Sequence, residues 1–208
     1  MAETVFGFSN RWGKLPATIY DSTYTSRYNM LDFNMAPHGD QPGRTYRYGG
    51  GVDGVLYPFG YGLSYTEFQL KEAQRQKRHI VVDTSSTSIE TVNFSVENMG
   101  SRDGDTVVMG FFTPDKFSTS EDELALALKY ELFTFERVSL KAGESIDMRY
   151  DIGAETLMVY DKNGDGVVIP GEYTITITEG GINDPKALKI HVTVSGTEKK
   201  IVQPFLKK

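Results

Sequence analysis

The sequence predicts a mainly β protein: an antiparallel β-sandwich with an aromatic-rich N-terminal extension and one short helix. Apolar and polar side chains alternate over several short segments after residue 75, and clusters of turn residues separate these segments. Alternation with a period of two is typical of half-buried strands, and several such strands between turns are typical of a sandwich. The extension is indicated by aromatic residues, because 14 of the 25 lie between Phe6 and Phe68, where no regular period is sustained.

Four segments show the clearest alternation and are predicted to be strands: residues 91–97, 146–152, 173–178 and 190–195. Residues 157–160 are also predicted to be a strand. Turns rich in Gly, Asn and Asp are expected between the strands, at residues 98–100, 141–143, 163–166 and 180–181.

A short helix is predicted on a long loop between two strands. Ser118 and Ser120 each precede a glutamate by three residues, which is a capping-box spacing. Leucines then repeat every four residues from Leu124 to Leu132, as on one face of a helix.

Charge and aromatic content divide the chain into two regions. Residues 1–75 carry 7 basic and 7 acidic side chains, whereas residues 76–208 carry 15 basic and 21 acidic ones, so the second region holds the entire net charge of −6. We therefore expect residues 1–75 to form the extension and residues 76–208 to form the sandwich domain.

Composition excludes several classes of function. The acidic balance disfavours binding to the phosphate backbone of nucleic acids. The absence of cysteine excludes disulfides, thiolate zinc sites and a cysteine nucleophile. No run approaches the roughly 20 apolar residues that would cross a bilayer, and no signal peptide is recognised. No nucleic-acid partner and no membrane-spanning segment are predicted, and the cellular location stays open.

A series of sequence words occurs in a fixed order along almost the whole chain: Gly13–Thr18 (GKLPAT), Gly43–Tyr48 (GRTYRY), Leu56–Phe68 (LYPFGYGLSYTEF), Val96–Asp105, Leu132–Ser145 and Pro170–Thr174. This series resembles the C-terminal part of glycoside hydrolase family 3, in particular its β-xylosidase and β-glucosidase branches. The resemblance implies that residues 1–75 are the end of the hydrolase α/β sandwich domain plus a linker. It also implies that residues 76–208 are a fibronectin type III-like, immunoglobulin-like sandwich domain.

The resemblance implies a non-catalytic region. Glycoside hydrolysis needs two carboxylates that flank one bond, and in the family both precede the segment that matches Gly13–Thr18. No catalytic residue is therefore assigned, and a structural or domain-stabilising role in carbohydrate metabolism is expected, in an extracellular or secretory setting. Two alternatives stay open: a freestanding carbohydrate- or protein-binding module, and the non-catalytic subunit of a split glycoside hydrolase.

The extension is the expected site of partner binding. Residues 1–7 are predicted to be the last turns of a helix, which favours a chain that is a fragment or that has lost its catalytic domains. The aromatic segment is then expected to pack against hydrolase catalytic domains, another protein chain or a second copy of itself. In the alternative interpretation, the segment folds back onto the sandwich.

One loop matches the pattern of a calcium site, D-x-N-x-D-G followed by five residues and Glu. The candidate ligands are Asp161, Asn163, Asp165, the carbonyl of Val167, and Glu172. Hard oxygen ligands at these positions would suit Ca²⁺, the one cofactor considered. The flanking segments, however, are predicted to be strands and not helices, so an acidic turn without metal stays open.

The remaining polar features are interpreted as surface. His38, His79 and His191 lie far apart in the sequence, so neither a catalytic triad nor a zinc site is predicted. Lys199 and Lys200 are interpreted as part of a solvated tail.

Overall fold

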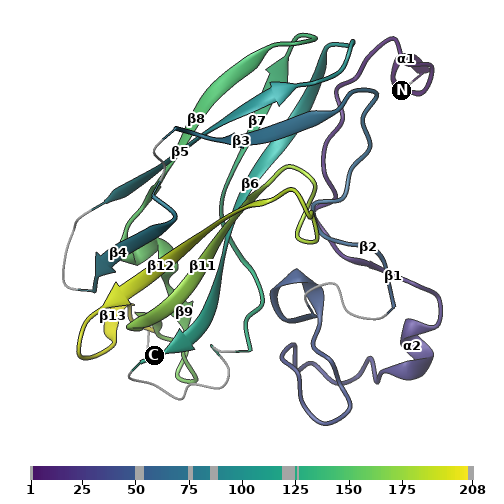
Figure 1. The fold of residues 1–208 in the computed structure, drawn as a ribbon. Coiled ribbons are helices and arrows are strands. Elements are labelled where there is room, and N and C mark those ends of the chain that lie inside the picture. The colour runs from purple at the N-terminus through teal and green to yellow at the C-terminus, as the bar shows by residue number, and fades with distance from the viewer. Residues whose placement is uncertain are drawn as a thin grey trace.

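Two β-sheets that share one hydrophobic core make up the centre of the computed structural model (Figure 1). The larger has the strand order β4 (His79–Asp83), β12 (Leu188–Ser195), β11 (Gly171–Thr178), β6 (Gly104–Phe117) and β7 (Glu131–Leu140). The smaller has the order β3 (Phe68–Glu72), β5 (Glu90–Asn98) and β8 (Ser145–Ile152). Neighbouring strands are antiparallel except β4 and β12, which are parallel. The mainly β sandwich prediction is confirmed.

The structure describes residues 2–49, 54–74, 77–84, 89–118, 125 and 127–205. A small sheet in the order β13 (Lys200–Gln203), β10 (Gly166–Val168) and β9 (Val159–Tyr160) adds buried valines to the main core. The N-terminal extension contains α1 (Ala2–Val5), α2 (Tyr24–Arg27), a π-helical turn (Thr45–Gly49) and the paired strands β1 (Ile19–Tyr20) and β2 (Val55–Tyr57). None of the described helices is long and apolar enough to cross a membrane.

The four clearest strand predictions are confirmed as β5, β8, β11 and β12. The predicted strand at residues 157–160 is shorter, because Ala154–Leu157 forms a 3₁₀ turn and only Val159–Tyr160 is a strand. Residues 119–124 and 126 of the predicted helix lie outside the described residues. Leu132 belongs to strand β7 instead, so the leucine repeat does not continue as one helix face.

The sandwich core is built from the inward residues of both sheets. Phe94 on β5 and Tyr150 on β8 are buried and meet edge to face, with ring centroids 5.1 Å apart. The hydroxyl of Tyr150 crosses to the other sheet and donates a hydrogen bond to the carbonyl of Val108 on β6, at 3.2 Å. Burial raises the pKa of Tyr150, so this hydroxyl stays a donor and the bond joins the two sheets over a wide pH range.

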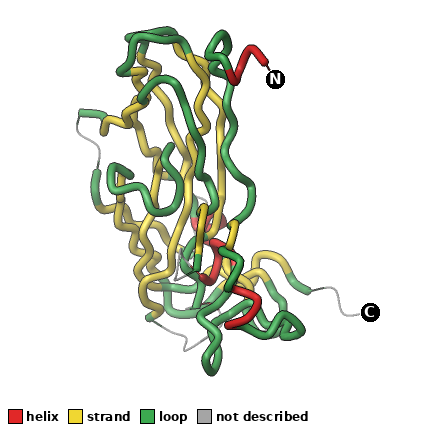
Figure 2. The backbone as a smooth tube through the Cα atoms, turned by 90° about the vertical axis from the view of Figure 1, so that its right-hand side faces the viewer, coloured by secondary structure: helices red, strands yellow, loops and turns green. Residues whose placement is uncertain are grey.

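Strand β6 is buried on both faces. Val108 and Phe112 point into the sandwich core, whereas Met109 and Phe111 belong to a second cluster on the outer face of the five-stranded sheet. Side chains of the extension and of the segment before and within β7 cover this cluster: Tyr46, Phe59, Tyr130 and Leu132. The extension runs down one side of the sandwich (Figures 1 and 2) and is part of the same folded body.

The extension approaches the sandwich so closely at one point that only glycine fits. A Cβ atom on Gly60 would lie 2.8 Å from Cε of Met109 and 2.9 Å from Cα of Gly181. Both glycines also have positive φ angles, 81° and 89°, which side chains other than glycine rarely tolerate. Gly60, in the middle of an aromatic segment, therefore sits directly on the turn between β11 and β12.

A buried asparagine joins the extension to two turns of the sandwich. Asn98 is 0% exposed, and its amide nitrogen donates to the carbonyls of Arg102 at 2.7 Å and Leu140 at 3.2 Å. Its amide oxygen accepts from the hydroxyl of Thr66 at 2.5 Å and from the backbone N–H of Gly100 at 3.1 Å. Every hydrogen-bonding position of this side chain is satisfied, as burial of a polar amide requires.

We expect Phe111→Ala to lower the free energy of unfolding by about 3–5 kcal/mol, because it empties a fully buried ring site between sheet and extension. Phe135→Ala is the matched control, since that ring is 68% exposed on the neighbouring strand, and a change of less than about 0.5 kcal/mol is expected there. Urea unfolding of both variants measures the difference. Equal effects of the two substitutions would contradict the second core cluster.

Candidate functional site

The first half of the predicted calcium loop forms one tight turn around Asp161. The side chain of Asp161 is buried, and its Oδ1 accepts hydrogen bonds from the backbone N–H groups of Asn163 at 2.9 Å and Asp165 at 3.1 Å. Asp165 in turn accepts from the backbone N–H of Phe205 at 2.6 Å. These three predicted ligands are therefore brought together, and the backbone already uses two of their carboxylate oxygens.

The second carboxylate oxygen of Asp161 is bound by a lysine ammonium group. Lys199 donates from Nζ to Oδ2 of Asp161 at 2.7 Å. Burial alone would raise the pKa of Asp161, but the hydrogen bonds from Lys199 and from the two backbone N–H groups hold it below its usual value. Lys199 and Lys200 are both exposed, as predicted, but Lys199 pairs with Asp161 and Lys200 is the first residue of β13, so this part of the tail is ordered. No local motif marks Lys199, because its partner lies 38 residues away.

The other two predicted calcium ligands lie outside this turn. Val167 is fully buried in β10, the middle strand of its sheet. Glu172 lies on β11, where its carboxylate accepts from the hydroxyl of Thr193 at 2.9 Å. Among the described residues, no three His, Asp or Glu side chains gather closely enough to hold a metal ion. Calcium binding stays a prediction, and the ion would have to compete with Lys199 for Asp161.

A melting experiment tests calcium binding directly. If calcium binds the turn, millimolar calcium raises the melting temperature of the chain above its value in chelator, because a ligand of the folded state stabilises it. Lys199→Ala should enlarge that shift by freeing an oxygen of Asp161, and Asp161→Asn should abolish it. A melting temperature that is the same in calcium and chelator, for both the native chain and Lys199→Ala, would contradict the calcium prediction.

The extension exposes many large apolar side chains. The described residues include 20 exposed large hydrophobic side chains, and 12 of them lie in the extension: Val5, Phe6, Phe8, Ile19, Met30, Leu31, Phe33, Met35, Leu56, Tyr57, Leu63 and Tyr65. The most exposed are Phe33 at 85%, Phe8 at 84% and Leu31 at 81%. The extension thus packs some of its side chains onto the sandwich through the second core cluster and exposes many others.

The loop from Asn29 to Arg44 carries the exposed tip of the extension and is fixed by polar contacts. The Arg44 guanidinium donates to the carbonyl of Asn29 at 2.5 Å and closes the loop. The His38 ring lies 2.9 Å from the carbonyl of Ala36 through Nδ1 and 2.6 Å from the Asp32 carboxylate through Nε2. Because both partners accept, the Ala36 carbonyl and the Asp32 carboxylate raise the pKa of His38. Protonated His38 therefore stabilises the loop at acidic pH, and this stabilisation is lost as the pH rises through the raised pKa.

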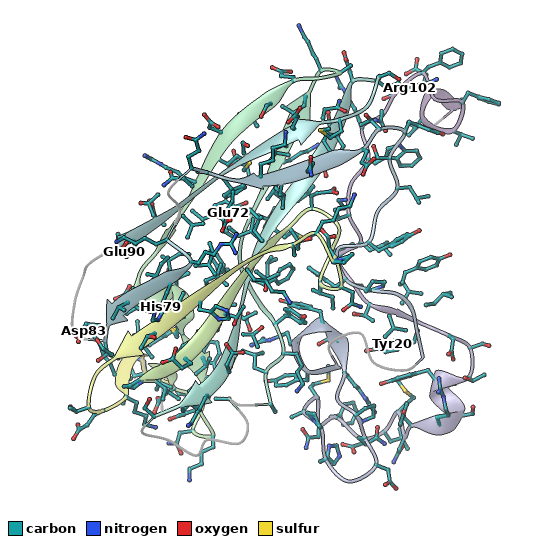
Figure 3. The ribbon with its side chains drawn as sticks, viewed as in Figure 1. Tyr20, Glu72, His79, Asp83, Glu90 and Arg102 are labelled. Carbon is teal, nitrogen blue, oxygen red and sulfur yellow. The ribbon has the colours of Figure 1, made fainter. Side chains whose placement is uncertain are left out.

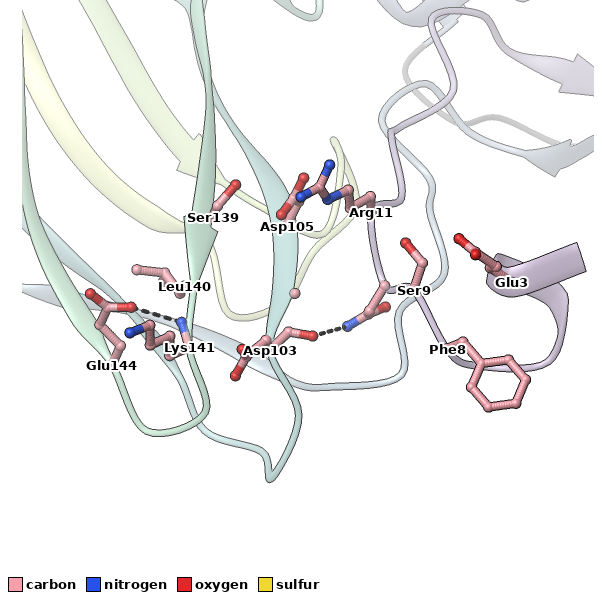
Figure 4. A pocket seen from close by; sticks show the side chains of 12 residues that line it. Glu3, Phe8, Ser9, Arg11, Asp103, Asp105, Ser139, Leu140, Lys141 and Glu144 are labelled. Carbon is pink, nitrogen blue, oxygen red and sulfur yellow. Dashed lines mark hydrogen bonds between the residues drawn. The ribbon is translucent and has the colours of Figure 1, made fainter. Parts of the chain in front are cut away.

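A polar cleft lies between the start of the extension and the ends of β6 and β7 (Figure 4). Asn10 crosses it, donating from Nδ2 to the carbonyl of Asp103 at 3.2 Å and accepting at Oδ1 from the backbone N–H of Tyr65 at 3.0 Å. Next to it, Arg102 donates to the carbonyl of Gly7 at 2.9 Å and holds the N-terminal helix against the sandwich (Figure 3). The cleft walls are thus joined by hydrogen bonds, which fixes the orientation of the extension.

The fold and the matching sequence together define the class of this domain. A family model of the fibronectin type III-like domain matches residues 123–180, which contain β7, β8 and β11. The five-stranded and three-stranded sheets, packed face to face, are therefore a fibronectin type III-like sandwich.

Comparison with full-length relatives extends the match beyond this domain to nearly the whole chain. The chain is 27% identical to the exo-1,4-β-xylosidase xlnD of Aspergillus niger over 98% of its length, which is 26% of that protein. The solved GH3 exo-β-xylosidase XlnD, in complex with a xylobiose aziridine probe, has the same fold, with a TM-score of 0.80 and 20% identity over 99% of this chain and 27% of the other. The GH3 β-glucosidase of Bifidobacterium adolescentis has a TM-score of 0.68 and 26% identity, and the match covers 93% of this chain and 27% of that protein.

The chain spans about a quarter of the length of the relatives it matches. It corresponds to the non-catalytic C-terminal region of these family 3 enzymes.

Proposed function

We propose that this chain stabilises and orients the hydrolase domains of a family 3 enzyme that removes terminal β-linked sugars such as xylose or glucose. The observation that carries the proposal is the exposed apolar side chains of the extension, which are 12 of the 20 exposed large hydrophobic side chains of the described residues. Large exposed apolar surface is typical of protein interfaces. The names of the relatives supply the substrate class.

Burial of this surface is energetically sufficient to hold a neighbouring domain. At roughly 25 cal/mol per Å² of apolar area, a few hundred Å² contribute several kcal/mol. An isolated partner would first have to lose translational and rotational freedom, whereas a domain on the same chain has largely lost it already. The extension is therefore better suited to hold a covalently linked or permanently associated domain than to capture a transient one.

The extension is also preorganised for an interface. The loop from Asn29 to Arg44 is closed by its own hydrogen bonds, and Tyr46 and Phe59 fix the following segment on the sheet. A surface that is ordered before binding loses less conformational entropy on association. These contacts support a role of the extension as a rigid connection between the sandwich and the hydrolase domains.

We expect these 208 residues, purified alone, to self-associate at micromolar concentration, because nothing then covers the exposed apolar side chains of the extension. Size-exclusion chromatography with light scattering should report a mass above that of one chain. Replacing Leu31 and Phe33 together by aspartate should restore the monomer. Val81→Asp is the control, since Val81 is exposed at 57% on the sandwich itself. A monomer at every concentration, with no effect of either change, would argue against an interface on the extension.

Hydrolysis by the isolated chain is not expected, because no carboxylate of this chain matches the family's nucleophile or acid/base. Incubation with aryl β-xyloside and aryl β-glucoside should give the uncatalysed rate. Turnover that survives repurification, and that follows the chain through chromatography, would overturn the non-catalytic assignment.

A further inference from the structure

Two histidines that are 112 residues apart in the sequence are neighbours on the outer face of the five-stranded sheet. His79 on β4 and His191 on β12 are register partners in the parallel pair. Both are exposed, whereas the next pair along, Ile80 and Val192, is buried in the core. Neighbouring strands lie about 4.8 Å apart, so the two side chains leave the same face of the sheet from adjacent positions. His79 and His191, which are far apart in the sequence, are therefore adjacent on the sheet.

The ring of His79 takes part in a hydrogen-bonded relay that ends on a carboxylate (Figure 3 labels His79). Its Nε2 lies 2.7 Å from the hydroxyl oxygen of Thr193. That hydroxyl donates its own proton to the carboxylate of Glu172, at 2.9 Å and 3.1 Å from the two oxygens. Because the Thr193 proton is used in this way, its oxygen accepts from Nε2–H of His79.

The ring of His191 takes part in a second relay of the same kind. Its Nδ1 lies 3.5 Å from the hydroxyl oxygen of Thr174, which donates to the carboxylate of Asp115 at 2.7 Å. Asp115 occupies an irregular position of β6, where the register against β11 shifts by one residue. Such a bulge re-aims a side chain, and here the carboxylate reaches the threonine beside His191.

The two relays define which ring nitrogen carries the lone pair in each neutral imidazole. Nε2 of His79 and Nδ1 of His191 are donors to threonine, so Nδ1 of His79 and Nε2 of His191 are the basic atoms. A hydrogen bond from the opposite nitrogen is the arrangement that orients metal-binding histidines. The carboxylates of Glu172 and Asp115 add negative charge nearby.

We propose that His79 and His191 form a two-imidazole site for a divalent late first-row transition ion, with water in the remaining positions. Imidazole ligands suit Cu²⁺, Ni²⁺ and Zn²⁺, and Cu²⁺ binds such ligands most tightly. Within the described part of the chain no third histidine or carboxylate completes a ligand cluster, so the site is open and exposed. It lies on the solvent-exposed half of the sheet face, whereas the extension covers Met109 and Phe111 on the other half.

Copper titration of the full, tag-free chain tests the site. We expect one Cu²⁺ per chain by calorimetry, with an electron paramagnetic resonance signal that shows coupling to two imidazole nitrogens. His79→Asn and His191→Asn should each weaken binding by more than about tenfold, and Thr193→Val, which removes the first relay, by about tenfold. Zn²⁺ should compete at the same residues with lower affinity.

The third histidine supplies the matched control. His38→Asn should leave the copper affinity unchanged, because both ring nitrogens of His38 already face oxygen acceptors in its own loop. Melting temperatures without metal show whether each variant is folded, and the exposed positions of His79 and His191 predict little change. Copper affinity that survives either His79→Asn or His191→Asn in a folded protein, or no nitrogen coupling, would overturn the proposal.

Discussion

The fold depends on the burial of β6 on both of its faces. Val108 and Phe112 pack into the sandwich core. Met109 and Phe111 pack on the outer face of the sheet, under Tyr46 and Phe59, in the second core cluster. Without the extension, the outward residues would expose apolar surface in the middle of the sheet, which monomeric proteins rarely tolerate. The extension and the sandwich are therefore energetically one unit, although charge and aromatic content distinguish them in the sequence.

Specific short contacts make this arrangement directional. Gly60 and Gly181 allow two backbones to approach more closely than any side chain would permit, and Asn98 joins the extension to two turns with four hydrogen bonds. Apolar burial supplies most of the stabilisation but is not directional. The glycine contact and the satisfied amide determine where the extension lies and hence which of its side chains face outward.

The sequence predicts the strands that have one face exposed to solvent. It does not predict strands that are buried on both faces, or contacts between residues that are distant in the sequence. The strand at residues 173–178 alternates clearly and is found as β11. Residues of β6 do not alternate, because the extension covers their second face, and Leu132 fits a helical spacing although it lies in β7. Lys199 is similarly unpredictable, since its contact with Asp161 depends on the tertiary path of the chain and not on local spacing.

The outer face of the five-stranded sheet serves two roles because it is covered over only part of its length. Near Met109 the extension covers β6 and β11, and the buried Thr176 lies there beside Phe111. At the other end of β11 the face is open, and Thr174 joins His191 to a carboxylate. The register of the parallel pair formed by β4 and β12 places His79 beside His191. The proposed ion site thus depends on this register and lies on the same sheet face whose other half is covered by the extension.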